Sequence, residues 1–157
     1  MPQSGPLLVF ICAANACRSV IAEAIAADEG RRRGLPLRVA SAGTRALHGY
    51  PAASIAQATM SEIGLSVQDH RSQPASSDLV AAATLVVTMT DEQRDMLRTA
   101  FKNHADRVLS INDVSGKGDV PDPIGGDPDE VRAVRDVLLS AMPDIFAALQ
   151  ERSAAAG

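Results

Sequence analysis

The sequence is poor in aromatic residues and in cysteine. Its 157 residues include no tryptophan, one tyrosine and three phenylalanines, and the net charge is −4. A nucleic-acid surface needs basic patches and stacking rings, so this composition argues against a nucleic-acid partner. The two cysteines, Cys12 and Cys17, are too few and too close together for the disulfide framework of a secreted protein. They favour a reducing, cytoplasmic environment.

Long apolar segments are also missing. The longest uninterrupted apolar run, Leu7–Ala14, is far shorter than the roughly 20 residues that span a bilayer. No basic segment precedes it as in a signal peptide, so we expect no membrane partner. The length and the 46% hydrophobic content predict one domain over residues 1–157 with a core of its own. We expect its last residues, Ser153–Gly157, to fray.

Four aliphatic runs predict the strands of a parallel sheet that is covered on both faces. These runs are Leu7–Cys12, Leu37–Ser41, Thr84–Met89 and Arg107–Ile111. Helical periodicity marks the segments Ser19–Arg33, Ala52–Ile63, Asp91–Lys102 and Asp127–Gln150, with a short helix at Ser76–Ala82. This alternation predicts an α/β fold, a doubly wound four-stranded parallel sheet with helices on both faces. Pro143 should kink the last helix near Ala141 or end it early.

The loop after the first strand is the candidate site. Residues 12–19 read Cys-Ala-Ala-Asn-Ala-Cys-Arg-Ser and join an apolar strand directly to a helical segment. Ligands of a doubly wound sheet bind beyond the carboxyl ends of its strands. Backbone N–H groups and the positive end of the helix dipole favour a bound anion there. We therefore expect an oxyanion site lined by the loop residues Ala13, Ala14, Asn15, Ala16 and Cys17.

Three side chains of this loop fit nucleophilic catalysis. The helix dipole and the loop amides favour the thiolate of Cys12, which would be the nucleophile. The planar guanidinium of Arg18 fits two oxygens of a tetrahedral anion. The hydroxyl of Ser19 is placed to donate a hydrogen bond to the sulfur. A buried, inert Cys12 followed by a surface arginine is the simpler alternative.

These residues carry a resemblance to a known family. Cys12 to Ser19 resembles the signature C-x-G-N-x-C-R-S-P of the low-molecular-weight protein-tyrosine-phosphatases, and the segment Ser41–Thr44 looks like their S-A-G-T motif. The resemblance implies that Asn15, Ser19, Ser41 and His70 form a hydrogen-bonded network that supports the loop. It implies a phosphorylated protein as substrate and a phosphocysteine intermediate, with no metal or cofactor.

The resemblance also assigns a general acid and a redox property. Asp122, between Pro121 and Pro123 in the loop that follows the last strand, stands where the family has its acid in an Asp-Pro pair. Without the resemblance it would be an ordinary turn aspartate. In family members, oxidation joins the counterparts of Cys17 and Cys12, which would protect the nucleophile from irreversible oxidation.

Departures from the signature leave the substrate open. Ala14 replaces the signature glycine, and a positive φ there would cost on the order of 1 kcal/mol. Where tyrosine-specific members have aromatic walls, this chain has Ile124 on one side and Leu47 with its neighbours on the other. Ala16 fits neither branch of the family, whereas Gly125 and Gly126 are similar to the protein-arginine-phosphatases.

Phosphotyrosine is the expected substrate and phosphoarginine the alternative. Thioredoxin-coupled arsenate reductases are also related, but their further cysteines around the third strand are missing, so a reductase would need an external thiol. A catalytically silent phosphate-binding module would keep Arg18 without needing Cys12 or Asp122.

Overall fold

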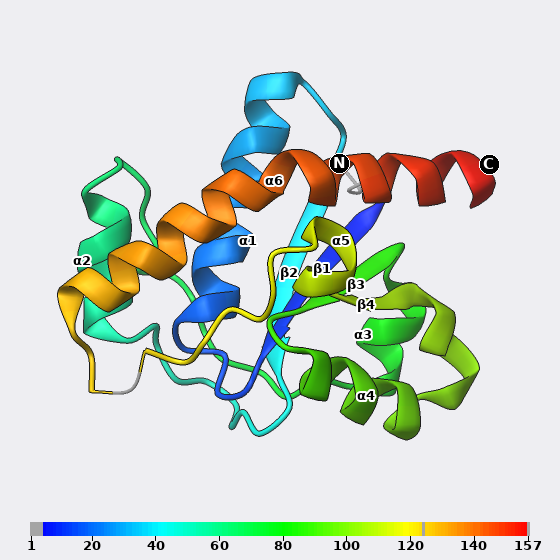
Figure 1. Ribbon diagram of the computed structural model, residues 1–157, viewed down its shortest axis with the longest axis horizontal. Coiled ribbons are helices and arrows are strands. Elements are labelled where there is room, and N and C mark those ends of the chain that lie inside the picture. Colours follow the sequence, from blue (N-terminus) through cyan, green and yellow to red (C-terminus); the bar gives the residue numbers. More distant parts are fainter. Residues whose placement is uncertain (1–4, 124, 157) are drawn as a thin grey trace.

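The computed structural model describes residues 5–123 and 125–156 and contains one parallel sheet (Figure 1). Its strand order is β2-β1-β3-β4. The strands are β1 (Leu7–Cys12), β2 (Arg38–Gly43), β3 (Leu85–Thr88) and β4 (Val108–Ser110). The two central strands, β1 and β3, are buried along their whole length, which explains why both faces of their sequences are apolar. The predicted four-stranded parallel sheet is confirmed, and β1 has the predicted bounds.

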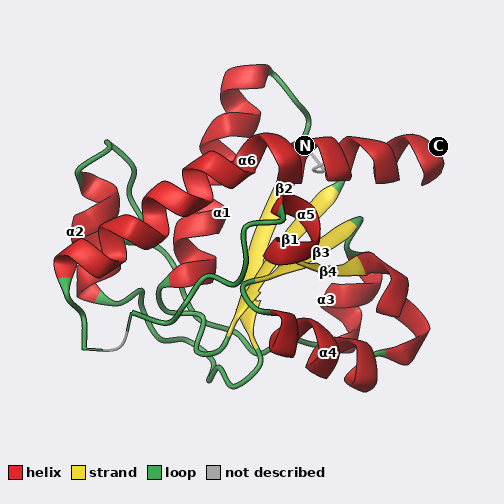
Figure 2. Ribbon diagram, viewed as in Figure 1, coloured by secondary structure: helices red, strands yellow, loops and turns green. Residues whose placement is uncertain are grey.

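Helices cover both faces of the sheet (Figure 2). One face, with Leu8 and Phe10 of β1, packs against α1, α2, α5 and α6. The other face, with Val9 and Ile11, packs against α3 and the end of α4, which continues into a 3₁₀ helix η1. The helices are α1 (Arg18–Arg33), α2 (Ser54–Ser61), α3 (Ser77–Ala82), α4 (Asp91–Ala100), η1 (Lys102–Arg107), α5 (Ile111–Ser115) and α6 (Pro128–Ala156).

The strand order places the loop after β1 at the point where the winding direction reverses. From β1 the chain first passes through α1 to β2 on one side, and later returns to β3 on the other side. Helices that follow β1 and β3 therefore leave toward opposite faces and open a space at the carboxyl ends of the strands. Figure 2 shows loops gathered at this end of the sheet.

Helix α5 is an element that the sequence prediction missed. The predicted fourth strand was Arg107–Ile111, but β4 ends at Ser110 because Ser110 caps α5. Its hydroxyl accepts a hydrogen bond from the backbone N–H of Asp113, and the Asp113 carboxylate accepts one from the N–H of Ser110. This reciprocal pair is a capping box, and its Ser-x-x-Asp pattern was the available signal.

Of the two outcomes predicted for Pro143, a kink or an early end of the last helix, the early end does not occur. Helix α6 continues through Pro143 to Ala156, and Figure 1 shows its axis changing direction between its orange and red parts. Pro143 removes the bond to the carbonyl of Leu139, and both residues lie on the solvent side of the helix. The buried side chains of Met142, Ile145 and Phe146 hold the helix on the sheet across this gap. The segment for which fraying is predicted is helical up to Ala156, and Gly157 lies outside the described residues.

Among the described helices, none combines the length and the apolar character that crossing a membrane requires.

Candidate active site

The backbone of the loop after β1 is fixed from outside. The carbonyls of Cys12 and Ala13 accept hydrogen bonds from the N–H groups of Thr44 and Arg45, both at 2.9 Å. Two further carbonyls are held in the same way. The N–H of Ala53 donates to the carbonyl of Ala16 at 2.9 Å, and Nε2 of His70 is hydrogen-bonded to the carbonyl of Asn15 at 2.8 Å.

These outward carbonyls orient the loop amides. In a trans peptide the carbonyl of one residue and the N–H of the next point in opposite directions, and no peptide bond among the described residues is cis. The N–H groups of Ala13, Ala14, Ala16 and Cys17 therefore point to the inner side of the loop. Four inward N–H groups make a concave anion-binding site.

The positive φ that would strain Ala14 is not at Ala14. The positive φ of the loop is at Asn15, with φ 57°, and Asn15 is the one non-glycine residue with positive φ in the described part of the chain. Asparagine tolerates this conformation better than most side chains. The methyl group of Ala14 therefore causes no backbone strain, and its side chain is exposed.

The sulfur of Cys12 lies at the base of this loop, at the carboxyl end of β1. Cys12 is 3% exposed, and its Sγ is 3.0 Å from Oγ of the buried Ser19. Helix α1 begins at Arg18, and its N-cap residue, Cys17, makes no side-chain capping bond. An uncapped helix end leaves backbone N–H groups for an anion. The structure thus brings the sulfur, a hydroxyl and a helix N-terminus to one point.

Asn15 joins four parts of the chain and is fully buried. Its Nδ2 donates to Ser19 Oγ and to Ser41 Oγ, each at 2.9 Å, and its Oδ1 accepts from the backbone N–H of Gln73 at 3.1 Å. His70 binds its carbonyl, as described above. The structure therefore connects Asn15, Ser19, Ser41 and His70, the four residues that the resemblance groups together.

Glu23 is a member of this cluster that sequence reasoning missed. Ser41 Oγ donates to Glu23 Oε1 at 2.5 Å. Burial raises the pKa of Glu23, while the Ser41 hydrogen bond and the nearby His70 act in the opposite direction. Glu23 follows Ser19 by four residues on α1, so helical spacing places both side chains on one face. That spacing was the signal that could have identified it.

Arg18 connects the Cys12–Ser19 loop to the segment that carries Asp122. The Arg18 side chain is 5% exposed, and its NH1 donates to the carbonyl of Val120 at 2.9 Å. The N–H of Val120 donates to the carbonyl of Met89 after β3, at 2.9 Å. Asp122 follows two residues later and is exposed. Guanidinium carries five N–H donors, so most remain for an anion.

Cys17 differs from Cys12 in its surroundings. Burial raises the pKa of the Cys17 thiol to about 11; Cys12 and Asp122 add to the increase, and Arg18 opposes it. At neutral pH Cys17 is therefore a thiol. Its electrostatic contact with both Cys12 and Asp122 also places these groups in one neighbourhood. Both cysteines are free.

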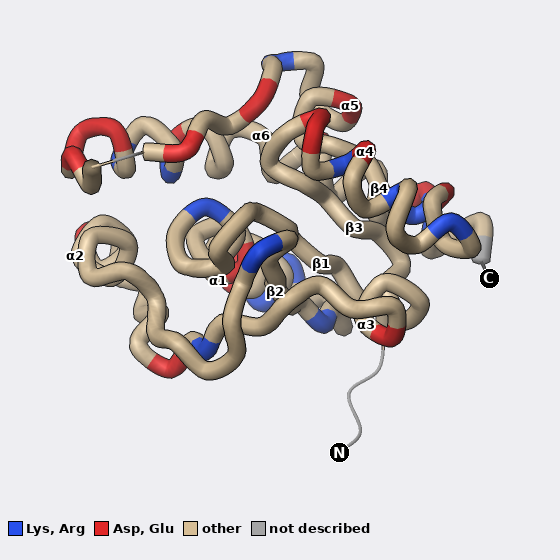
Figure 3. Tube along the Cα trace, turned by 90° about the horizontal axis from the view of Figure 1, so that it is seen from below, with Lys and Arg blue, Asp and Glu red and all other residues tan. Residues whose placement is uncertain are grey.

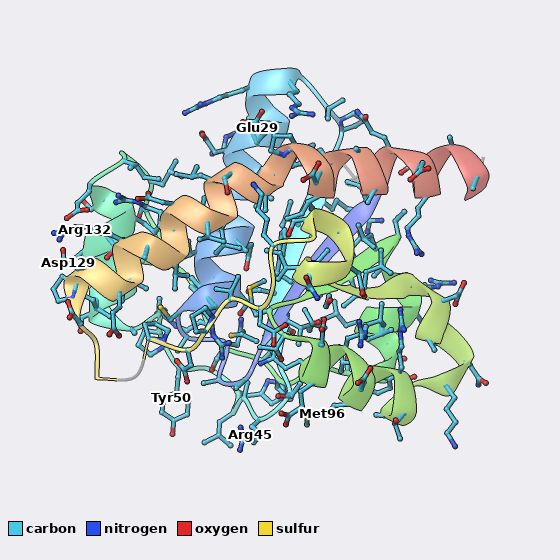
Figure 4. All side chains as sticks on the ribbon, viewed as in Figure 1. Glu29, Arg45, Tyr50, Met96, Asp129 and Arg132 are labelled. Atoms are coloured by element: carbon cyan, nitrogen blue, oxygen red, sulfur yellow. The ribbon has the colours of Figure 1, made fainter. Side chains whose placement is uncertain are left out.

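The segment expected to form one wall of the site carries apolar side chains on a fixed backbone. Leu47 and Tyr50, between β2 and α2, are 67% and 59% exposed. Ser72 fixes this loop through four hydrogen bonds. Its N–H donates to the carbonyl of Tyr50, and its hydroxyl donates to the carbonyl of Leu47. Its carbonyl accepts from the N–H of Gly49, and its hydroxyl accepts from the N–H of Tyr50. Figure 4 shows Tyr50 and Arg45 projecting from the loop end of the molecule. The opposite wall residue, Ile124, lies outside the described residues.

Charges of both signs surround this end of the molecule. Viewed from the carboxyl ends of the strands, Lys and Arg positions are interspersed with Asp and Glu (Figure 3). In residues 5–123 and 125–156, no three His, Cys, Asp or Glu side chains lie close enough together to hold a metal ion.

Comparison with known families gives one match over nearly the whole chain. Residues 7–155 match the family described as low molecular weight phosphotyrosine protein phosphatase. The chain is 34% identical over 133 aligned positions to a protein-arginine-phosphatase of Bacillus subtilis, covering 83% of this chain and 88% of the relative. It is also 34% identical to the low molecular weight protein-tyrosine phosphatase A of Mycobacterium tuberculosis, covering 99% of both chains.

A solved structure has the same fold. A mutant of YwlE from Bacillus subtilis superimposes with a TM-score of 0.87 and 30% identity, covering 93% of this chain and 99% of the other. Another YwlE arginine phosphatase structure, with a TM-score of 0.86, 31% identity and coverage of 92% and 95%, contains a phosphorylated active-site serine.

Proposed function

Because the chain belongs to the low-molecular-weight phosphotyrosine protein phosphatase family, and is thus a phosphomonoesterase, we propose that it hydrolyses phosphotyrosine in proteins with Cys12 as the nucleophile. The observation that carries this proposal is the position of the Cys12 sulfur below the inward N–H groups of its loop, 3.0 Å from the Ser19 hydroxyl. Hydrogen bonds to sulfur favour the thiolate over the thiol.

The first step forms a bond between the Cys12 sulfur and phosphorus. The thiolate attacks in line with the departing tyrosine oxygen, and the loop amides and Arg18 hold the three equatorial oxygens. The bond from phosphorus to the tyrosine oxygen breaks, and Asp122 gives its proton to that oxygen. The products are tyrosine and a phosphocysteine.

The second step uses water. Asp122, now a carboxylate, takes a proton from a water molecule while the water oxygen attacks phosphorus. The bond between sulfur and phosphorus breaks, which releases inorganic phosphate and returns the Cys12 thiolate. Ser19 supports the sulfur in both steps, because its hydroxyl can donate to the thiolate as nucleophile and as leaving group.

Leu47 and Tyr50 support an aromatic substrate. Exposed apolar side chains on a backbone that Ser72 already fixes can contact a phenyl ring with little loss of conformational entropy. A tyrosine ring whose phosphate reaches the buried sulfur would extend past such a wall. Leu47 would then form one side of the ring pocket.

Phosphoarginine is the second candidate. Gly125 and Gly126 have φ of 89° and 68°, and this Gly-Gly pair is similar to that of the protein-arginine-phosphatases. Relatives named protein-arginine-phosphatase support this candidate. The guanidinium of phosphoarginine is planar but polar, so its binding depends less on apolar contacts than that of a phenyl group.

The deciding experiment compares two peptides of one sequence, with phosphotyrosine or phosphoarginine at the same position. We expect a larger kcat/KM for phosphate release from the phosphotyrosine peptide than from the phosphoarginine peptide. Cys12→Ser should release phosphate from neither peptide. A larger kcat/KM for phosphoarginine would reverse the substrate assignment. Cleavage of neither, with vanadate still bound, would contradict the proposed function and leave a binding module or a reductase using an external thiol.

Oxidation of the site should depend on Cys17 and on pH. Peroxide converts the Cys12 thiolate to a sulfenic acid, and attack by Cys17 then forms a disulfide and releases water. Because the pKa of Cys17 is raised to about 11, its thiolate fraction is small at neutral pH and grows as the pH rises. We therefore expect disulfide formation to accelerate from pH 7 to pH 9, as measured by mass spectrometry after thiol blocking.

The same experiment has a functional readout. Dithiothreitol should restore a larger part of the starting activity in the wild type than in Cys17→Ser, because the variant proceeds to irreversible oxidation. Each protein is compared with its own activity before peroxide. Equal recovery in both proteins would show that Cys17 gives no protection.

A further inference from the structure

We propose that Asn112 of α5 is a positioning residue for the general acid: it fixes the backbone segment 118–123 from which Asp122 projects. This inference rests on the proposed role of Asp122. Asn112 lies outside the Cys12–Ser19 loop, and its side-chain hydrogen bonds in the described structure go to Asp91 and Gly118, so its action would be through the segment.

The start of this segment is anchored at three consecutive residues. The N–H of Gly118 donates to Asn112 Oδ1 at 2.9 Å. Oδ1 of Asp119 accepts from the N–H of Asp91, at the start of α4, at 3.0 Å. The next residue, Val120, is held through both its N–H and its carbonyl, as described above. A surface loop is seldom bonded this densely, and the bonds end just before Asp122.

The orientation of the Asn112 amide is imposed by Asp91. Hydrogen bonds from Ser110 and Asn112 hold the pKa of Asp91 below its usual range, so this carboxylate is ionised and accepts only. Asn112 Nδ2 donates to Asp91 Oδ2 at 3.2 Å, and Ser110 Oγ donates to Oδ1 at 2.5 Å. With its N–H₂ group directed to Asp91, Asn112 must present its carbonyl oxygen to the N–H of Gly118.

Two prolines transmit this anchor to Asp122. Pro121 has a fixed φ, and the residue before each proline, Val120 or Asp122, is restricted to extended conformations. The three residues from Val120 to Asp122 therefore form a stiff connection. A shift of the anchor should move the carboxyl group as one piece instead of being absorbed by the loop, and a misplaced acid transfers its proton poorly.

The test compares two aryl phosphates that differ in their leaving group. Phenyl phosphate needs protonation of its poor leaving group, whereas 4-nitrophenyl phosphate does not. We expect Asn112→Ala to lower kcat/KM for phenyl phosphate roughly tenfold, a part of the 10²–10⁴-fold that a general acid supplies, and to change kcat/KM for 4-nitrophenyl phosphate less than about threefold. Damage to the nucleophile or to the anion site would lower both values equally.

A second variant and a matched control protect the test against misfolding. Asp119→Ala removes an independent anchor from an exposed position and should show the same dependence on the leaving group. Asn103 is an exposed asparagine of η1, and Asn103→Ala should leave kcat/KM unchanged for both substrates. Thermal denaturation of each variant verifies that it is folded.

A double mutant separates this inference from the role of Asp122. When Asp122→Asn is already present, adding Asn112→Ala should not lower kcat/KM for phenyl phosphate any further, because both changes act on one proton transfer. A multiplicative loss in the double mutant, or equal losses on both substrates in the single variants, would overturn the inference alone. If Asp122→Asn itself shows no dependence on the leaving group, the assignment of the acid is wrong, and the inference fails with it.

Discussion

Cys12→Ser should lower kcat for phosphate release on the order of 10⁶-fold, the scale on which removal of a covalent nucleophile is felt. The serine hydroxyl is not ionised near neutral pH, so the hydrogen bonds and dipole that favour a thiolate have no anion to favour. The site itself should persist, because its loop is held by backbone hydrogen bonds from Thr44, Arg45 and Ala53, and not by the sulfur. The loss should appear in kcat, with binding of the phosphate group preserved.

Three measurements check this prediction. Phosphate release gives kcat, vanadate binding reports the anion site, and rapid acid quenching followed by mass spectrometry detects phosphocysteine in the wild type. Vanadate binding by the serine variant within a few-fold of wild type would show an intact loop. Residual turnover within a hundredfold of wild type would contradict Cys12 as nucleophile and point to direct attack by water.

The sequence predicted the sheet and the position of the Cys12–Ser19 loop because both depend on local signals. β1 and β3 are apolar on both faces since helices cover both sides, and this is visible as uninterrupted aliphatic runs. The position of Cys12 at the end of β1, directly before α1, follows from the same pattern. Strand-loop-helix order therefore placed Cys12 directly before the N-terminus of α1, where an anion site is expected.

Features that depend on contacts distant in sequence were not predicted from local patterns, and the grouping of Asn15 with Ser41 came from the family resemblance alone. The signature glycine drew attention to Ala14, but the left-handed residue is Asn15, whose side chain is bonded to Ser41 and to the backbone of Gln73. Those partners come from β2 and from the loop before α3, so no local pattern reveals them. Pro143 was predicted to kink the last helix or to end it early, and the local pattern could not decide between the two; burial of the neighbouring side chains keeps α6 continuous.

Arg18→Lys is expected to lower kcat/KM roughly 10³-fold or more, which is the range for an arginine that stabilises a transferring phosphoryl group. Lysine cannot hold two equatorial oxygens with one planar group. Lysine also cannot reproduce the hydrogen bond from Arg18 NH1 to the carbonyl of Val120. Val120 is 1% exposed and anchors the segment that carries Asp122. One substitution would thus weaken the anion site and loosen the acid.

The two effects of Arg18→Lys can be separated by substrate. Loss of phosphate binding raises KM for every aryl phosphate, whereas a loosened acid lowers kcat/KM further for phenyl phosphate than for 4-nitrophenyl phosphate. We expect both, because Arg18 is the one side chain seen to bond the Asp122 segment from the Cys12–Ser19 loop among the described residues. Arg32→Lys, an exposed arginine at the other end of α1 paired with Asp28, is the matched control and should change neither value. A uniform loss on both substrates would mean that Arg18 acts on the phosphate alone and that the segment keeps Asp122 in place through its bonds to Met89, Asp91 and Asn112.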